Sequence, residues 1–78
     1  MSAHAPLPKL EEVQKGKYKH YKGGLYEVIG TARHSETLEE LVVYLMLENN
    51  SLWVRPKTMF LGEIEHNGKK MKRFEFLG

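Results

Sequence analysis

Cysteine is absent from this chain of 78 residues, and no run of apolar residues is long. Without thiols the protein can form no disulfide, no thiolate metal site and no cysteine nucleophile. The longest apolar run covers residues 41–47, whereas a membrane-spanning helix needs about 18 apolar residues. The first residues, which include Pro6 and Pro8, do not look like a signal peptide either. We therefore expect a cytoplasmic protein without a membrane partner.

A strong excess of charge of one sign is also lacking, because the formal net charge is +2 and the pI is about 8.9. Dedicated nucleic-acid-binding domains usually have a higher pI and clustered basic residues. Here the basic residues form two loose groups: Lys15, Lys17, Lys19 and Lys22, and Lys69, Lys70, Lys72 and Arg73. The simplest interpretation is a solvated, mildly basic surface.

Metal and cofactor signatures are missing as well. The four histidines, His4, His20, His34 and His66, show no H-x-x-x-H spacing and have no cysteine partner. Gly23 and Gly24 precede an expected strand and not a helix, so they do not form a phosphate-binding loop. We therefore expect neither a metal site nor a cofactor.

The clearest strand runs from Leu25 to His34, where polar and apolar residues alternate. Its more apolar face, which should point inward, carries Tyr26, Val28, Gly30, Ala32 and His34. A glycine in the middle of a strand predicts a bulge or a sharp bend at Gly30.

Residues 37–47 fit two structures. Thr37 and Glu40 match a capping box, and Leu38, Leu41, Val42 and Leu45 have helical spacing. The β-branched and aromatic composition of residues 41–44 favours a strand instead. We interpret Leu41 to Leu47 as a strand after a tight loop, with a helix as the alternative.

Turn signals occur at Lys22-Gly23-Gly24, at Asn49-Asn50 and at Asn67-Gly68. Together with a short 3₁₀ turn over 57–60, they predict a mainly β fold: a small antiparallel SH3-like barrel of five to six strands. We expect core residues at Val28, Val43, Val54 and Phe74. Residues 1–14 should be a disordered or short helical extension, with disorder over Met1 to Lys9, and 15–78 a single domain.

The order and spacing of several short motifs are specific. They are Gly16-x-Tyr18-x-His20-Tyr21-Lys22-Gly23, Tyr26-x-Val28-x-Gly30-x-Ala32-x-His34-Ser35-Glu36-Thr37, Val42-Val43-Tyr44, Trp53-Val54-Arg55-Pro56-x-x-Met59-Phe60 and Arg73-Phe74. In these motifs the chain resembles a bacterial and phage family known as domain-of-unknown-function family 1653. The resemblance covers nearly all of the expected ordered chain and implies no established activity.

The densest polar cluster is Arg33, His34, Ser35 and Glu36, followed by Thr37. Trp53 and Arg55 share one strand face, where an indole could stack and a guanidinium could bind a phosphate or carboxylate. With His20, these residues form our candidate ligand-binding set, and we assign no catalytic residue. The competing interpretations are that Ser35 and Thr37 bond local backbone, that Trp53 is a core residue, and that Arg55 forms an ion pair with Glu36.

Three functions follow from these residues. The first is a non-catalytic binding module for an anionic ligand, either a nucleotide-like small molecule or single-stranded nucleic acid. The second is a protein-interaction module that binds a protein partner through an exposed strand edge. The third, least favoured, is a small hydrolase that uses His34, Ser35 and Glu36, although adjacent strand residues point to opposite faces.

Overall fold

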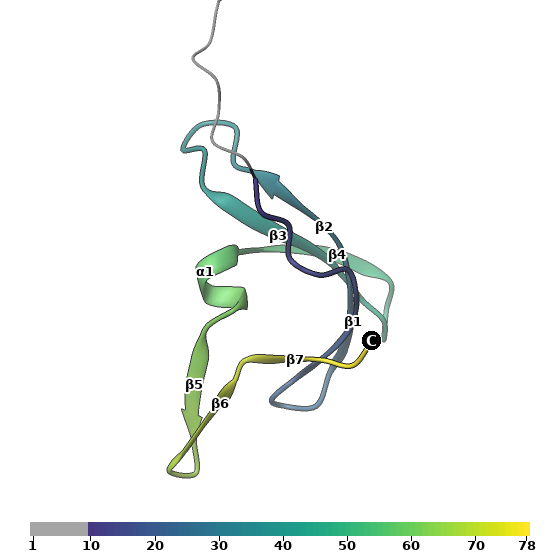
Figure 1. Ribbon diagram of the computed structural model, residues 1–78. Coiled ribbons are helices and arrows are strands. Elements are labelled where there is room, and N and C mark those ends of the chain that lie inside the picture. The colour runs from purple at the N-terminus through teal and green to yellow at the C-terminus, as the bar shows by residue number, and fades with distance from the viewer. Residues whose placement is uncertain (1–9) are drawn as a thin grey trace, which may run out of the picture.

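The computed structural model describes residues 10–78 and contains seven strands and one short helix (Figure 1). The elements are β1 (Gly16–His20), β2 (Leu25–Arg33), β3 (Glu40–Met46), β4 (Ser51–Pro56), α1 (Lys57–Phe60), β5 (Glu63–His66), β6 (Lys69–Lys72) and β7 (Phe74–Phe76). The stretch Met1 to Lys9, for which disorder is expected, lies outside the described residues. The fold is mainly β, as the sequence predicts.

Five strands form one antiparallel sheet in the order β4-β3-β2-β1-β7, and β5 pairs with β6 in a separate hairpin. The sheet curls but does not close, because β4 and β7 are its two edges and do not pair. The residues after the Asn67-Gly68 turn are divided between β6 and β7, which belong to different sheets. The term barrel therefore describes the curvature only.

All three predicted turns connect antiparallel strands. Asn67 and Gly68 both have positive φ, 53° and 76°, as the two central residues of a type I′ hairpin turn require. The residues expected in a 3₁₀ turn form one turn of α-helix, because the Leu61 N–H reaches the carbonyl of Lys57 four residues earlier.

The predicted bulge in β2 is present, because the pairing with β3 shifts between Val28 and Gly30. Before the shift, Tyr26 and Val28 face inward as expected. Beyond it the faces are exchanged: Thr31 pairs with buried Val42, so Thr31 lies on the core side. The expectation that Ala32 and His34 share the inward face is therefore wrong, because one extra residue reverses the alternation.

Residues 40–46 form a strand, which confirms the interpretation chosen over a helix. The loop before it uses Thr37 differently from a helix cap. The hydroxyl of Thr37 accepts a hydrogen bond from the N–H of Glu39 at 3.2 Å, and the Leu38 N–H donates to the carbonyl of His34. These contacts make a turn, and the β-branched residues that follow then pair with β2 and β4.

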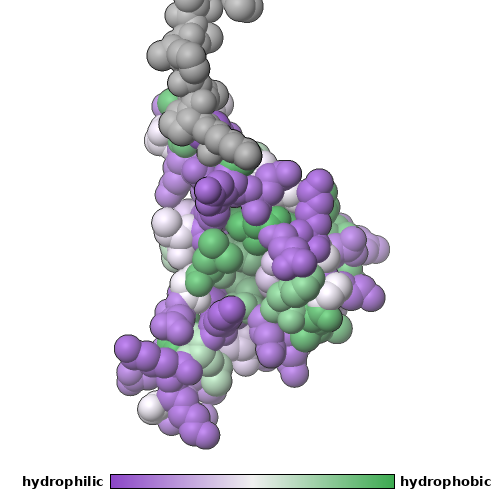
Figure 2. Space-filling view, in the orientation of Figure 1, coloured by the Kyte–Doolittle hydropathy of each residue, from purple (hydrophilic) through white to green (hydrophobic). Residues whose placement is uncertain are grey.

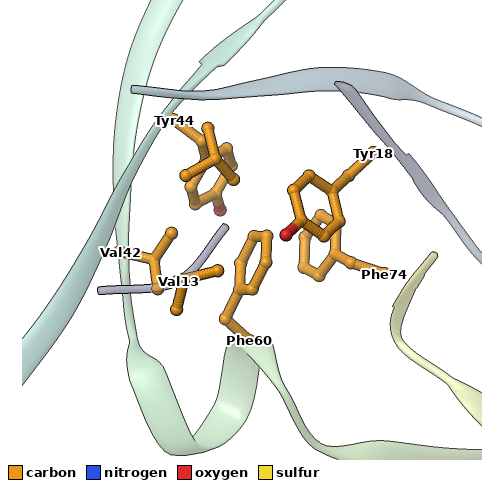
Figure 3. Packing of buried hydrophobic residues seen from close by; sticks show 7 residues of the cluster. Val13, Tyr18, Val42, Tyr44, Phe60 and Phe74 are labelled. Atoms are coloured by element: carbon orange, nitrogen blue, oxygen red, sulfur yellow. The ribbon is translucent and has the colours of Figure 1, made fainter. Parts of the chain in front are cut away.

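The core lies on the concave face of the sheet and is largely aromatic (Figure 3). Its buried members are Val13, Tyr18, Val28, Val42, Tyr44, Phe60 and Phe74. Phe60 of α1 stacks on Phe74 of β7 with a centroid distance of 4.2 Å. Of the expected core residues, Val28 and Phe74 are buried, but Val54 is 58% exposed because it points to the convex face opposite Val43. Val43 itself is half-buried.

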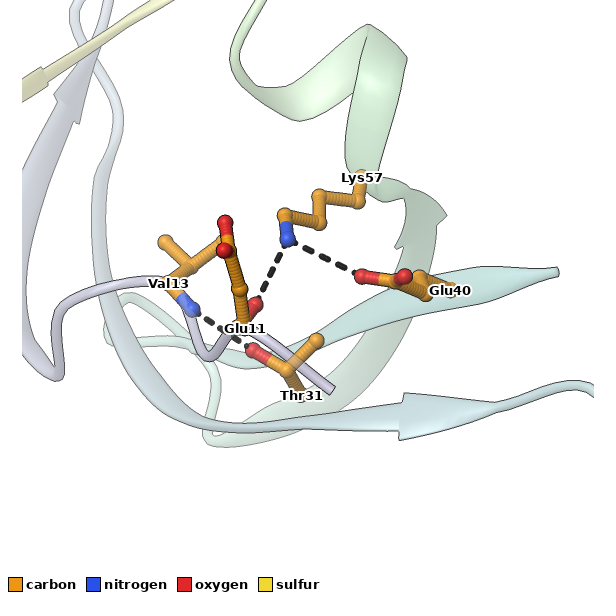
Figure 4. Close-up of polar contacts among 5 residues, drawn as sticks. All are labelled: Glu11, Val13, Thr31, Glu40 and Lys57. Carbon is orange, nitrogen blue, oxygen red and sulfur yellow. Dashed lines mark hydrogen bonds and ion pairs between the residues drawn. The ribbon is translucent and has the colours of Figure 1, made fainter. Parts of the chain in front are cut away.

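Residues 10–15, which precede β1, are not helical and pack across the concave face (Figures 1 and 4). The N–H of Val13 donates to Thr31 Oγ1 at 2.9 Å, and the hydroxyl of Tyr18 donates to the carbonyl of Gln14 at 2.7 Å. Lys57 Nζ donates to the carbonyl of Glu11 and also bonds Glu40 Oε1, at 2.6 and 2.9 Å. Val13 is therefore part of the core, although it precedes the expected domain start at residue 15.

Gly16, at the start of β1, should not tolerate a side chain. Its φ is +135°, and an added Cβ would lie 3.0 Å from the ring of Phe76. We expect Gly16→Ala to lower the free energy of unfolding by about 1 to 3 kcal/mol, the usual cost of a strained backbone. Gly30→Ala is the control, because a Cβ there meets nothing within 4 Å and φ is not positive. Equal urea midpoints for the two variants would contradict this prediction.

Candidate functional site

The end of β2 and the loop after it contain Arg33, His34, Ser35 and Glu36, four of the seven residues expected to bind a ligand. The Nδ1 atom of His34 accepts hydrogen bonds from the backbone N–H groups of Glu36 and Thr37, at 3.1 and 3.3 Å. Ser35 and Glu36 are exposed. The imidazole of His34 therefore stabilises the turn that follows it, which is a structural role for this side chain.

This geometry does not suit a hydrolase. In a catalytic triad the Nδ1–H of histidine donates to a carboxylate, which leaves Nε2 free to accept the proton of serine. Here Nδ1 of His34 is itself an acceptor, so the neutral ring carries its proton on Nε2. Nε2 then has no lone pair with which to activate Ser35.

Trp53 and Arg55 lie on the concave side of β4, opposite Tyr44 and Val42 of β3. Trp53 is 50% exposed, so it is not a core residue. Arg55 Nε donates to the Tyr44 hydroxyl at 3.4 Å, and its guanidinium lies 5.7 Å from the centroid of Phe74. In the part of the chain that the structure describes, no ion pair joins Arg55 to Glu36.

Arg55 instead connects the two edges of the open sheet, because it lies on β4 and contacts Phe74 on β7. His20, at the end of β1, packs against the same ring of Phe74 with a centroid distance of 4.9 Å. We call the group around this contact the seam cluster: His20, Tyr26, Tyr44, Arg55, Arg73 and Phe74. His20 and His34 lie near opposite ends of β2, so the structure separates the candidate residues into two groups.

The electrostatic surroundings of His20 are cationic. Burial is the largest effect that lowers the pKa of the His20 imidazole below its ordinary value. The positive charges of Arg55, Arg73 and Lys22 lower the same pKa further, in that order. No carboxylate contributes in the opposite direction. An anion bound among these groups would relieve the repulsion and raise the pKa of His20.

The ring of His20 is also fixed in one tautomer when neutral. Its Nδ1 accepts a hydrogen bond from the Lys22 N–H at 3.1 Å, which places the proton on Nε2. Among the described residues, no group accepts a hydrogen bond from that Nε2–H. His20 therefore offers a donor next to two guanidinium groups.

Arg73 lies where the chain passes from β6 to β7. Its backbone makes two hydrogen bonds: the Arg73 N–H donates to the carbonyl of Gly62 at 3.1 Å, and the Arg73 carbonyl accepts from the N–H of Tyr21 at 3.0 Å. Its Nε is buried and has no hydrogen-bond partner within the described residues. Burying a donor without a hydrogen-bond partner costs free energy. A bound ligand that accepts a hydrogen bond from Arg73 would explain why the protein keeps this donor.

A pocket of about 340 Å³ adjoins the seam cluster at His20. Its other lining residues are Lys19, Tyr21, Met71, Lys72 and Glu75. This volume is at the lower end of the range for small-molecule sites, about 300 to 1,000 Å³. His20 is therefore the residue that joins this pocket to the two arginines.

The sequence alone did not indicate half of the seam cluster. Arg73 belongs to one of the two loose basic groups, and nothing in the sequence distinguishes it from its neighbours. Tyr26 and Tyr44 are typical core residues by pattern. Tyr26 contacts His20 and Tyr44 bonds Arg55 through neighbouring strands, and the two pairs meet at Phe74 because the sheet curls until β7 approaches β4.

Two further classes of site find no support within residues 10–78. None of the helices described is long and apolar enough to cross a bilayer. The described histidines and carboxylates form no group of three or more that could hold a metal ion.

Comparison with known proteins gives the family. The model of DUF1653, described as a protein of unknown function, matches residues 16–76. A crystal structure of a DUF1653 protein from Bordetella bronchiseptica is similar in fold, with a TM-score of 0.79 and 30% identity over 85% of this chain and 88% of that one. No curated protein matches the chain. Because the family model covers most of the chain, the protein belongs to the DUF1653 family.

Proposed function

We propose that this protein is a non-catalytic binding module for a small anionic ligand and that the seam cluster binds it. One observation carries the proposal: Arg55 and His20 contact the same ring of Phe74, and Arg73, next to Phe74 in the chain, has a buried Nε without a hydrogen-bond partner in the described residues. Both arginines lack an ion pair within residues 10–78. Guanidinium groups suit phosphates and carboxylates because their donors form a planar fork.

The site differs from the one that the sequence suggested. In the loop around His34 the backbone N–H groups of Glu36, Thr37 and Glu39 are already hydrogen-bonded, whereas Arg73 Nε in the seam cluster has no partner in the described chain. Groups that are already paired gain little from a ligand, and a buried donor without a partner gains a hydrogen bond. This contrast favours His20, Arg55 and Arg73 over Ser35 and Glu36 as the ligand-binding residues.

The test is an NMR titration of the protein with inorganic phosphate. We expect shifts of the amides of His20, Arg55 and Arg73, and a rise in the pKa of His20 in the bound state. Arg55→Gln should weaken binding at least about tenfold, because a hydrogen bond to a charged group contributes about 1.5 to 3 kcal/mol. Removing Arg55 should not unfold the protein, since within residues 10–78 its side chain makes one hydrogen bond, at 3.4 Å, and one ring contact, with Phe74.

Lys69→Gln is the matched control, because it removes the same charge from an exposed position in the β5–β6 hairpin. Its affinity for phosphate should stay within about twofold of that of the unaltered chain. Equal losses in both variants would mean that phosphate is attracted only by net charge. If phosphate shifts only the amides of residues 33–37, the anion site lies in the β2–β3 loop and not in the seam cluster.

A protein-interaction module is the second candidate, and the edge strand β4 favours it. Leu52 and Val54 are 65% and 58% exposed on the convex side of this strand, and none of the strands in residues 10–78 pairs with the outer edge of β4. The space-filling view also shows apolar surface among the hydrophilic residues (Figure 2). Exposed apolar edges pair readily with other strands. A partner held there would bind with little dependence on salt, unlike a phosphate.

A further inference from the structure

The only tryptophan of the chain, Trp53, lies on the same face of β4 as Arg55 of the seam cluster. Its side chain is held in place, because the indole Nε1–H donates to Ser51 Oγ at 2.7 Å. The Ser51 hydroxyl in turn donates to Asn49 Oδ1 at 2.5 Å. The one polar atom of the indole is therefore satisfied within the hairpin, while half of the residue stays exposed.

The distance between Trp53 and Arg55 suits a small ligand that contacts both side chains. They lie two residues apart on the same face of β4, which sets their Cα atoms about 6.6 Å apart along the strand. Tyr44 lies opposite Trp53 and bonds Arg55, so it connects the two. An aromatic ring next to a guanidinium group matches a ligand whose flat ring is joined to an anion by a short linker.

The remaining basic residues do not extend this site into a track for a polymer. In the β5–β6 hairpin, Glu63 lies opposite Lys72 and Glu65 lies opposite Lys70. Opposite charges at paired positions offset one another. Proteins that bind single strands need a long positive groove as well as stacking residues. Near His20 the positive charges are those of Arg55, Arg73 and Lys22, and Arg55 reaches the ring of Phe74, which follows Arg73 in the chain. A group of this size suits one or two phosphate groups.

We infer that the ligand class is a nucleoside phosphate of mononucleotide size, with the base on Trp53 and the phosphate on Arg55 and Arg73. This inference rests on the proposed function and adds the ring-binding half of the site. Base stacking on an aromatic side chain contributes enough to change affinity by about tenfold or more. A nucleoside monophosphate should therefore bind about tenfold more tightly than the same sugar phosphate without a base.

The experiment compares adenosine 5′-monophosphate, ribose 5-phosphate and a short oligothymidylate, using the intrinsic fluorescence of Trp53 and NMR of the His20 ring. Because Trp53 is the only tryptophan, any change in indole fluorescence reports on this position alone. We expect the nucleotide to quench Trp53 and shift His20, and ribose 5-phosphate to shift His20 only. In Trp53→Leu the two ligands should bind equally, whereas Leu52→Ala, on the convex face, should leave the tenfold difference intact.

Each other outcome rejects a defined part of the argument. If both ligands shift His20 with equal affinity and neither quenches Trp53, the stacking inference fails and the anion site remains. If neither ligand shifts His20 at millimolar concentration, the anion site fails as well. If the oligothymidylate binds far more tightly than the mononucleotide, with a steep dependence on salt, the ligand is a single-stranded nucleic acid and the inference of a mononucleotide is wrong.

Discussion

Replacing Phe74 by alanine is expected to lower the free energy of unfolding by about 3 to 5 kcal/mol, the usual cost of removing a buried aromatic ring. Phe74 is 4% exposed and contacts the rings of Phe60, Tyr44 and Tyr26. Its ring joins edge strand β7 to Phe60 of α1 (Figure 3). Small domains have about 5 to 15 kcal/mol of stability in total, so this loss would be a large share.

Val54→Ala is the matched control, because the strand pattern suggests a core position for Val54 as well. The side chain of Val54 is 58% exposed, and surface substitutions usually change stability by no more than about 0.5 kcal/mol. Urea unfolding followed by tryptophan fluorescence would measure both variants. A larger loss for Val54→Ala than for Phe74→Ala would mean that the convex face is buried, as it would be in a dimer.

The second large effect is expected at Val13, which lies before the first strand. Val13 is 5% exposed within the aromatic core, and burying a valine contributes about 1.5 to 3 kcal/mol. An aspartate there would not stay buried without a partner. We therefore expect Val13→Asp to release the segment and to lower the free energy of unfolding by about 2 to 3 kcal/mol.

Glu12→Ala tests whether the effect belongs to the buried side chain and not to the segment as a whole. Glu12 is exposed and makes no hydrogen bond within the described residues, so its replacement should leave the unfolding midpoint unchanged. Hydrogen exchange would show the same difference locally: the amide of Val13, which is bonded to Thr31 Oγ1, should lose protection in Val13→Asp. Equal midpoints for the two variants would show that the segment does not contribute to the core.

Two features of the site were accessible from the sequence, and the rest were not. Trp53 and Arg55 share a strand face because alternation in β4 is regular. The sequence also predicts His20 as a ligand-binding residue. One interpretation of the sequence pairs Arg55 with Glu36 in the loop after β2. In the structure its partners are Tyr44 and Phe74 instead, because the curvature of the sheet brings β7 to β4 and leaves the loop near the other end of β2.

The sequence by itself indicated the mainly β class, the three turns, a bulge or bend at Gly30 and, over a helical alternative, a strand from Leu41 to Leu47. These features depend on neighbouring residues: turn chemistry, alternation and β-branched composition act over a few positions. The tertiary structure alone decided which face of β2 is inward after the bulge, that Val13 is core and Val54 is not, and that Arg73 joins His20 and Arg55. Those outcomes depend on contacts between residues far apart in the chain, which the register and curvature of the sheet create.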